Sequence, residues 1–279
     1  MKILILGSTG MIGHKLYYHL SKSNKYEVLN LSKSKLNKDT IIHDLSDYLY
    51  LDELIKQCNP RIVINAAGLL INDCDKNSYK GLILNALVPN FLAQISSHRN
   101  FKLIQISTDC VFSGKNGPYR DNELPDELSN YGKFKSIGEI RGNNNLTIRT
   151  SVIGPDLFED GEELLSWFLR QEKKINGYTK SIWSGVTTLE LAKCVENSIE
   201  NDYVGLKNLS SDSPISKYEL LLILNRVFKK NINITPIDGP IHNKSLIGSD
   251  DFYNTSPMSY EDLISDMFED INDSGLYKL

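Results

Sequence analysis

Short apolar segments alternate with longer amphipathic ones through the first half of the chain. Lys2–Leu6 is apolar after its first residue, which is typical of a strand buried on both faces of a sheet. Ile12, Leu16 and Leu20 then recur at the spacing of one helix face. Alternating strands and helices predict an α/β fold, with a parallel sheet covered by helices on both faces. The other predicted strands are 26–31, 61–65, 102–107 and 146–149, and the helices between them include 51–58 and 79–98.

A glycine-rich turn of the form Gly-x-x-Gly-x-x-Gly follows the first predicted strand. Its first glycine permits a tight turn, its second lets a diphosphate approach the backbone, and its third lets the next helix pack against the strand. The free N–H groups at the start of that helix favour phosphate. The turn therefore predicts a Rossmann-type dinucleotide site, and a purely structural turn is the alternative. The predicted contacts are Gly7, Thr9, Gly10, Met11, Ile12 and Gly13.

The end of the second predicted strand bears on the choice between NAD and NADP. NAD-binding folds usually carry Asp or Glu there, roughly 20 residues after the glycines, to bind the ribose hydroxyls. This chain has Ser32, Lys33 and Lys35 instead, and no acid. These side chains suit a 2′-phosphate, so NADP is the predicted cofactor and NAD the alternative. Ordinary solvated lysines are the other interpretation.

The pattern becomes irregular after about Thr150, where polar turns separate shorter helices at 164–173, 188–200 and 217–228. We therefore expect residues 1–150 to form an NADP-binding Rossmann domain. Residues 151–279 are expected to form a smaller, mostly substrate-binding lobe that is partly interleaved with the Rossmann core.

Composition narrows the function classes. A net charge of −4 offers no basic surface for nucleic acid. The four cysteines form no Cys-x-x-Cys pair and the five histidines no ligand cluster, so neither a metal site nor a disulfide frame is expected. His14 and His19 are expected at the surface. No apolar run reaches the ~18 residues of a membrane helix and no signal peptide is expected, which favours the cytoplasm.

A Tyr-x-x-x-Lys pattern supplies the candidate chemistry. On a helix the two side chains lie one turn apart, and the ammonium would lower the pKa of the phenol. The pattern begins three times, at Tyr18, Tyr131 and Tyr203. Only Tyr131, paired with Lys135, follows a strand that ends in a hydroxyl-rich turn, residues 107–109. A hydroxyl at that end of a strand would polarise a substrate carbonyl while tyrosine protonates it.

Taken together, these motifs resemble the extended short-chain dehydrogenase/reductases, and within them the dTDP-4-dehydrorhamnose reductase family. The resemblance extends from residue 1 to about residue 192. It implies NADPH-dependent reduction of a 4-keto-6-deoxy sugar carried on a nucleoside diphosphate, in deoxysugar and surface polysaccharide biosynthesis. The matching stretches are Gly7–Gly13, Asp44-Leu45, Asn65–Gly68, Asn85-Ala86, Ser107–Asp109, Val111–Gly114, Tyr131–Lys135, Gly138-Glu139 and Arg149–Ser151.

The resemblance implies a role for each matching residue. Tyr131 would donate the proton, Lys135 would tune its pKa and bind the nicotinamide ribose, and Thr108 would polarise the carbonyl. A plain strand-ending turn at 65–68 and a buried, structural Asn85 are the alternatives for two of the matches. The implied cofactor contacts are Asp44 and Leu45 at the adenine, Ala66, Ala67 and Gly68 along the cofactor, and Asn85 behind it.

One position departs from the family pattern. Cys110 follows Thr-Asp where the rhamnose reductases usually carry tyrosine and the 4,6-dehydratases carry glutamate, so dehydration is disfavoured. GDP-fucose synthase resembles this chain here, and its cysteine is an acid/base in epimerisation. Cys110 is therefore interpreted either as a small buried residue or as the acid/base of a bifunctional epimerase–reductase. A non-catalytic NADP-binding subunit, similar to the beta subunit of methionine adenosyltransferase, is the alternative from another class.

An aromatic and polar segment, residues 175–188, precedes a predicted helix. The corresponding part of the family contacts the sugar nucleotide, and a Trp183 packed in the core is the alternative. Near Lys244 the family carries an arginine that is missing here, which leaves the sugar and the nucleotide open. A homodimer is expected, and no acidic cluster matches the magnesium that some members use. The candidate substrate residues are Asp109, Cys110, Tyr178, Lys180, Trp183 and Thr187.

Overall fold

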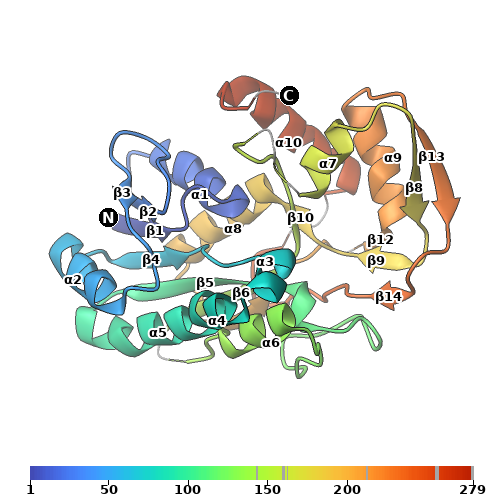
Figure 1. Cartoon of the computed structure of the whole chain (residues 1–279). Helices are drawn as coiled ribbons and strands as arrows, with labels where there is room; N and C mark the ends of the chain where they lie inside the picture. The colour runs from blue at the N-terminus through green and yellow to red at the C-terminus, as the bar shows by residue number, and fades with distance from the viewer. Residues whose placement is uncertain (143, 159–160, 162, 212, 255–257, 278–279) are drawn as a thin grey trace.

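A seven-stranded parallel sheet with helices on both faces forms the centre of the molecule in this computed structural model (Figure 1). The structure describes residues 1–142, 144–158, 161, 163–211, 213–254 and 258–277. The predicted Rossmann-type α/β fold is confirmed. The strands are β1 (Lys2–Leu6), β2 (Glu27–Ser32), β3 (Ile41–Ile42), β4 (Ile62–Asn65), β5 (Lys102–Thr108), β6 (Leu146–Thr150) and β11 (Gly205–Asn208).

Alternate residues of the strands supply two cores, one on each face of the sheet. Ile3 and Ile5 pack on the face covered by α1 (Met11–Ser21) and α8 (Thr188–Glu200). Leu4 and Leu6 pack on the opposite face, under α2 (Tyr48–Cys58) and α5 (Val88–Arg99). Burial on both faces explains why β1 is a continuous apolar run.

The strand order, β11-β6-β5-β4-β1-β2-β3, reverses direction between β1 and β4. The chain runs from β1 outward to β3 and then returns to β4 on the other side of β1. In such sheets the loops after the two central strands diverge and leave a crevice at their carboxyl ends. The glycine turn and the loop after β4 border this crevice.

The helix predicted at 79–98 is confirmed as one continuous helical segment, which contains a π-helical turn that the sequence did not predict. The segment forms α4 (Ser78–Leu82), a π-helical turn η1 (Ile83–Leu87) and α5, after a separate α3 (Ile71–Lys76). Pro89 has no N–H for the carbonyl of Asn85, so the regular α-helical bond cannot form there. The extra residue of the turn accommodates this loss.

The second half of the chain builds a lobe with a third core and also returns to the sheet. α8 and β11 belong to the sheet layer, whereas α7 (Leu164–Leu169), α9 (Lys217–Val227) and α10 (Tyr260–Ser274) enclose the lobe core. The helix predicted at 164–173 ends at Leu169. No helix in the described part of the chain is long and apolar enough to cross a membrane. The lobe strands include β8 (Lys174–Tyr178), β9 (Ser181–Trp183), β12 (Ile215–Ser216), β13 (Asn233–Ile237) and β14 (His242–Asn243). The remaining elements are the 3₁₀ turn η2 (Asp109–Val111), the helix α6 (Asn130–Ile137) and the short strands β7 (Val152–Ile153) and β10 (Val186–Thr187).

Candidate active site

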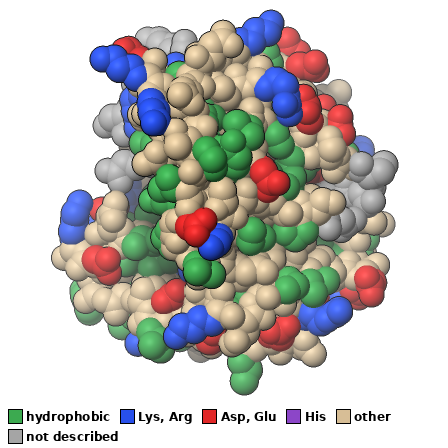
Figure 2. Space-filling view, turned by 90° about the vertical axis from the view of Figure 1, so that its right-hand side faces the viewer, with side chains coloured by type: hydrophobic (Ala, Val, Ile, Leu, Met, Phe, Trp, Pro, Cys, Tyr) green, Lys and Arg blue, Asp and Glu red, His purple; other side chains and the backbone are tan. Residues whose placement is uncertain are grey.

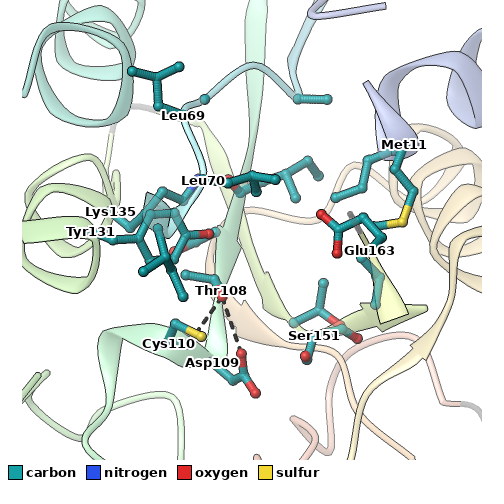
Figure 3. Close-up of a pocket in the computed structure, with 18 of the residues that line it drawn as sticks. Met11, Leu69, Leu70, Thr108, Asp109, Cys110, Tyr131, Lys135, Ser151 and Glu163 are labelled. Carbon is teal, nitrogen blue, oxygen red and sulfur yellow. Dashed lines mark hydrogen bonds between the residues drawn. The ribbon is translucent and has the colours of Figure 1, made fainter. Parts of the chain in front are cut away.

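A cavity of ≈ 420 Å³ lies at the carboxyl ends of β1, β4, β5 and β6, where the strand order reverses. Figure 3 shows Tyr131 and Thr108 projecting into it, with Met11 and Glu163 on the opposite wall. Its lining therefore combines the start of α1, the loop after β4, the hydroxyl-rich turn and α6. The lining residues include Met11, Ile12, Ala66, Ala67, Gly68, Leu69, Leu70, Thr108, Asp109, Cys110, Tyr131, Lys135, Ser151 and Glu163.

The glycine turn is packed so closely that side chains are excluded. A Cβ on Gly13 would lie 2.1 Å from the carbonyl oxygen of Gly7, and one on Gly7, whose φ is +81°, would lie 2.7 Å from Cα of Ala67. Gly10 is the N-cap of α1 and adds no side-chain cap to the helix. The first N–H groups of α1 therefore lack side-chain acceptors from the cap and lie beside the cavity, an arrangement that fits a diphosphate.

A cluster of charges follows β2, where the sequence predicts the cofactor phosphate. Lys33 Nζ lies 3.2 Å and Lys80 Nζ 3.7 Å from the same Asp44 oxygen. Burial acts to raise the pKa of Asp44, but hydrogen bonds from Ser46 and the Lys33 ammonium lower it to about 2. Two lysines share one carboxylate, so the cluster retains positive charge suited to a 2′-phosphate. Lys80 was missed in the sequence because it lies on a separate helix.

Ser32 and Leu45, two other predicted cofactor residues near this cluster, are buried in the protein. The Ser32 hydroxyl is buried and donates to the carbonyl of Ser34. The Ser34 hydroxyl donates to Thr9 Oγ1 at 3.1 Å, which ties the loop after β2 to the glycine turn. Leu45 is buried in the core beside α2. None of these three residues is among those that line the cavity, so the contact of Ser32 and Leu45 with a cofactor stays a prediction.

Asn85 braces the loop that follows β4. Its Oδ1 accepts a hydrogen bond from the Leu69 N–H, and its Nδ2 donates to the Leu69 carbonyl, both at 2.9 Å. A Cβ on Gly68 would lie 2.7 Å from Asn85 Oδ1, so glycine permits this close contact. The cavity is lined by Ala66, Ala67 and Gly68, which the sequence predicts to contact the cofactor. Asn85 supports this loop from inside the protein.

The Tyr131 pair is brought to the cavity by close packing of α6 against η2. Ser129 caps α6 by accepting a bond from the Gly132 N–H, and a Cβ on Gly132 would lie 2.6 Å from the Cys110 carbonyl oxygen. The other two Tyr-x-x-x-Lys pairs lie elsewhere. Tyr18 lines a separate hollow beside α10, and Lys207 bonds Asp251.

The electrostatics of Tyr131 differ from the expectation. Burial raises its pKa above the ordinary value, the neighbouring Cys110 and Asp109 add to this, and a hydrogen bond with Thr108 opposes it. Lys135 is not among these main influences, because its Nζ donates to the Ile106 carbonyl at 2.7 Å. Burial lowers the pKa of Lys135 to about 8. At neutral pH the phenol therefore keeps its proton, and the predicted lowering of its pKa by Lys135 is not seen in this structure.

Thr108 and its two successors form a tight turn, in which Asp109 is buried and the other two residues are partly exposed. The Thr108 hydroxyl donates to Asp109 Oδ1 at 3.2 Å and accepts from the Cys110 N–H at 3.1 Å (Figure 3). Burial raises the pKa of Asp109, and burial together with the Asp109 charge raises the pKa of Cys110 to about 12. The Cys110 thiol is therefore protonated at neutral pH. Lys217 and Lys244, which the sequence did not single out as binding residues, partly offset the charge of Asp109.

None of the four candidates in the lobe is among the residues that line the cavity, although Trp183 contacts one of them. Trp183 is 3% exposed, packs in the lobe core and donates from Nε1 to Ser151 Oγ at 2.8 Å. Thr187 caps α8 by accepting the Glu190 N–H. In this structure the Trp183 Nε1 is bonded to Ser151 and the Thr187 hydroxyl caps a helix, so both polar groups already have partners within the protein.

Tyr178 and Lys180 lie on the outer part of the lobe. Tyr178 is 43% exposed, and Lys180 pairs with Asp238 at 2.6 Å. On the side of the molecule that carries β9, β13 and β14, hydrophobic side chains gather around isolated charges (Figure 2). Glu163, by contrast, faces the cavity opposite Tyr131 and was missed, because nothing in its local sequence marks it. Among the described residues, no group of three or more His, Cys, Asp or Glu side chains could hold a metal ion.

The sequence matches one protein family over more than half of its length. The RmlD substrate binding domain family matches residues 1–178. The chain belongs to this family. The predicted resemblance to dTDP-4-dehydrorhamnose reductases is thereby confirmed at the level of the family.

Its relatives carry several different names. The spore coat polysaccharide biosynthesis protein SpsK of Bacillus subtilis is 26% identical over 227 residues, which are 78% of this chain and 76% of that protein. A dTDP-4-dehydrorhamnose reductase of Aggregatibacter actinomycetemcomitans is 30% identical over 50% of this chain and 45% of its own. The beta subunit of methionine adenosyltransferase 2 of Xenopus laevis is 30% identical over 58% of this chain and 49% of its own. The chain thus spans about half of each of these last two relatives.

Solved structures share the whole architecture. The dTDP-4-dehydrorhamnose reductase of Bacillus anthracis in complex with NADP superposes with a TM-score of 0.82 and 20% identity, covering 96% of this chain and 99% of that one. At this identity the likeness concerns the fold, which includes the lobe as well as the sheet.

Proposed function

We propose that this protein is an NADPH-dependent oxidoreductase that reduces the keto group of a 4-keto-6-deoxy sugar carried on a nucleoside diphosphate. The observation that carries the proposal is one cavity that joins the glycine turn, Thr108 and Tyr131 at the point where the sheet reverses. Ligands of open α/β sheets bind there. Family membership and a relative crystallised with NADP support the enzyme class and the cofactor.

The side chains divide the chemistry between them. NADPH, when bound, supplies the hydride. Tyr131 donates its proton to the oxygen on which negative charge develops, and its raised pKa keeps the phenol protonated until that moment. Thr108 hydrogen-bonds the same oxygen, for which its proton must turn away from Asp109. Lys135, whose Nζ donates to the Ile106 carbonyl, stays mostly charged at neutral pH, and its proposed role is to bind the nicotinamide ribose.

Epimerisation by Cys110 is the second candidate and has less support. Epimerisation requires the Cys110 thiolate to remove a proton from the sugar, but burial raises the pKa of this thiol to about 12 and keeps it protonated at neutral pH. The non-catalytic NADP-binding subunit is suggested by the methionine adenosyltransferase relative. Against it stands the complete set of Thr108, Tyr131 and Lys135 around one cavity.

The proposed setting is deoxysugar and surface polysaccharide biosynthesis in the cytoplasm, where NADPH and nucleotide sugars are available. The named role of SpsK in spore coat polysaccharide biosynthesis supports this setting. A homodimer and a particular sugar remain predictions that substrate screening and sedimentation would test.

The decisive experiment offers purified protein NADPH and a panel of 4-keto-6-deoxy nucleotide sugars, and follows the loss of NADPH absorbance. Tyr131→Phe should cut turnover about 10²–10⁴-fold while NADPH binding persists. Tyr203→Phe is the matched control, because Tyr203 begins the same sequence pattern outside the cavity and packs against Phe252. Near-normal turnover by the Tyr131→Phe variant would refute the assignment. NADPH binding without turnover on any sugar would favour the regulatory subunit instead.

A further inference from the structure

His14, expected at the surface, is completely buried beneath the glycine turn. Its Nδ1 lies 2.9 Å from the carbonyl oxygen of Gly10, and its Nε2 lies 2.8 Å from the hydroxyl of Tyr277. Tyr277 belongs to the tail that follows α10, 263 residues along the chain from His14. The two rings also meet edge to face, with centroids 5.5 Å apart. The start of α1 is thus joined directly to the C-terminal tail.

The chemistry of the three groups fixes the direction of both hydrogen bonds. A carbonyl oxygen only accepts, so Nδ1 of His14 must carry the ring proton and donate it to Gly10. Nε2 is then the acceptor, and Tyr277 donates to it. Burial lowers the pKa of His14 to about 4 and raises the pKa of Tyr277, so both groups are neutral near pH 7.

The Gly10 carbonyl matters because it shares a rigid plane with the next N–H. In a trans peptide the C=O of Gly10 and the N–H of Met11 point in opposite directions. The Gly10 oxygen accepts both the backbone N–H of His14, at 3.0 Å, and its Nδ1 proton, so it is held on the protein side and the Met11 N–H is directed away from it. Met11 and Ile12 line the cavity, at the helix end that is proposed to receive the diphosphate.

A second contact joins α1 to α10, the helix from which the tail extends. Lys15, the neighbour of His14 on α1, forms a buried ion pair with Asp270 of α10. The side chains of this pair are 6% and 15% exposed, so water screens them little. The tail is therefore docked next to the cofactor turn by two independent polar contacts.

We infer that His14 and Tyr277 are positioning residues of the cofactor site, through which docking of the C-terminal tail and binding of NADPH strengthen each other. The inference rests on the proposed function for the place of the diphosphate. Coupling between two binding events is reciprocal, so bound NADPH must also hold the tail more firmly.

The test compares Tyr277→Phe, which removes one hydroxyl and keeps the ring, with Tyr253→Phe. Tyr253 is a matched control because its hydroxyl also makes one partly buried bond, to Glu190 at 2.8 Å. Fluorescence titration should show the dissociation constant for NADPH raised about fivefold in Tyr277→Phe, the value of one hydrogen bond, and unchanged in Tyr253→Phe. The turnover number at saturating NADPH should not change. His14→Asn should recover most of the affinity lost in His14→Leu, because the amide can replace the Nδ1 donor.

Hydrogen exchange supplies an independent readout. In the wild type, NADPH should slow exchange of the amides of residues 270–277, and the Tyr277→Phe variant should lose this protection. Equal NADPH affinities for the two tyrosine variants, or a fall in turnover without a change in affinity, would overturn the inference and leave the proposed function standing. A wild-type protein that does not bind NADPH would overturn both.

Discussion

Replacing Arg149 by methionine is expected to destabilise the fold strongly. The guanidinium is fully buried, and its Nε and Nη2 lie 2.8 and 2.6 Å from the two carboxylate oxygens of Glu139, whose side chain is 2% exposed. It also lies 4.8 Å from the centre of the Phe112 ring. Methionine is about as long but carries no charge. It would leave Glu139 with the Ser107 hydroxyl at 2.8 Å and the more distant, half-exposed Arg141 at 3.9 Å.

The size of the effect follows from burial. Removing one partner of a buried ion pair costs about 3–5 kcal/mol of unfolding free energy, because the other charge stays buried. The chain contains a matched control in Arg226 and Glu261, whose contacts are also bidentate, at 2.8 and 2.7 Å. Their side chains are 59% and 52% exposed, so Arg226→Met should cost less than about 1 kcal/mol.

Urea unfolding of the three proteins, each without ligand, measures the difference. Its pH dependence gives a second check, because an unpaired buried carboxylate has a raised pKa. Between the unfolded and the raised folded pKa, the native state binds more protons than the unfolded state, so stability falls as pH rises. The deficit of Arg149→Met should therefore shrink toward acidic pH. Equal unfolding free energies for the Arg149→Met and Arg226→Met variants would refute the reasoning.

Three further predictions concern the cavity. Gly13→Ala should abolish NADPH binding in a titration, because its Cβ would lie 2.1 Å from the Gly7 oxygen, whereas Gly142→Ala, with nothing within 4 Å, should bind normally. Lys33→Ala should weaken the binding of NADPH more than that of NADH, and an equal loss for both would argue against a 2′-phosphate contact. Because burial raises the pKa of Cys110 to about 12, alkylation followed by mass spectrometry should find it nearly unreactive at pH 7 and faster as pH rises. Rapid labelling at pH 7 would contradict the burial of this thiol.

The parts of the fold that the sequence predicted depend on local patterns. Short continuous apolar runs located the main strands of the sheet, and the glycine spacing located the cofactor turn, because each constraint acts within a few residues. The upstream hydroxyl distinguished Tyr131 from the two other tyrosines with the same spacing. This worked because strand ends meet at one edge of a parallel sheet.

The failures depend on partners far apart in the sequence. Trp183 is an aromatic residue of the kind that binds sugars, but its ring packs in the lobe core and its Nε1 donates to Ser151. His14 was expected at the surface, but it is buried and its ring contacts Tyr277, which lies 263 residues away in the sequence. Glu163 lies at the start of α7 and lines the cavity, and no local pattern in the sequence indicates this.

Strand β11, which completes one edge of the sheet, comes late in the sequence. It pairs with β6 from Gly205 to Asn208, more than fifty residues after β6 ends, and the segment that matches the family stops before it. Before β11 pairs with it, β6 is an edge strand whose backbone groups on that side have no partner, and the burial of Arg149 is incomplete. A nascent or truncated chain that ends near residue 178 would therefore contain the glycine turn and Tyr131, but β6 would be an exposed edge strand able to pair with other chains. Such fragments should aggregate, and assays of this protein belong on chains that extend past Asn208.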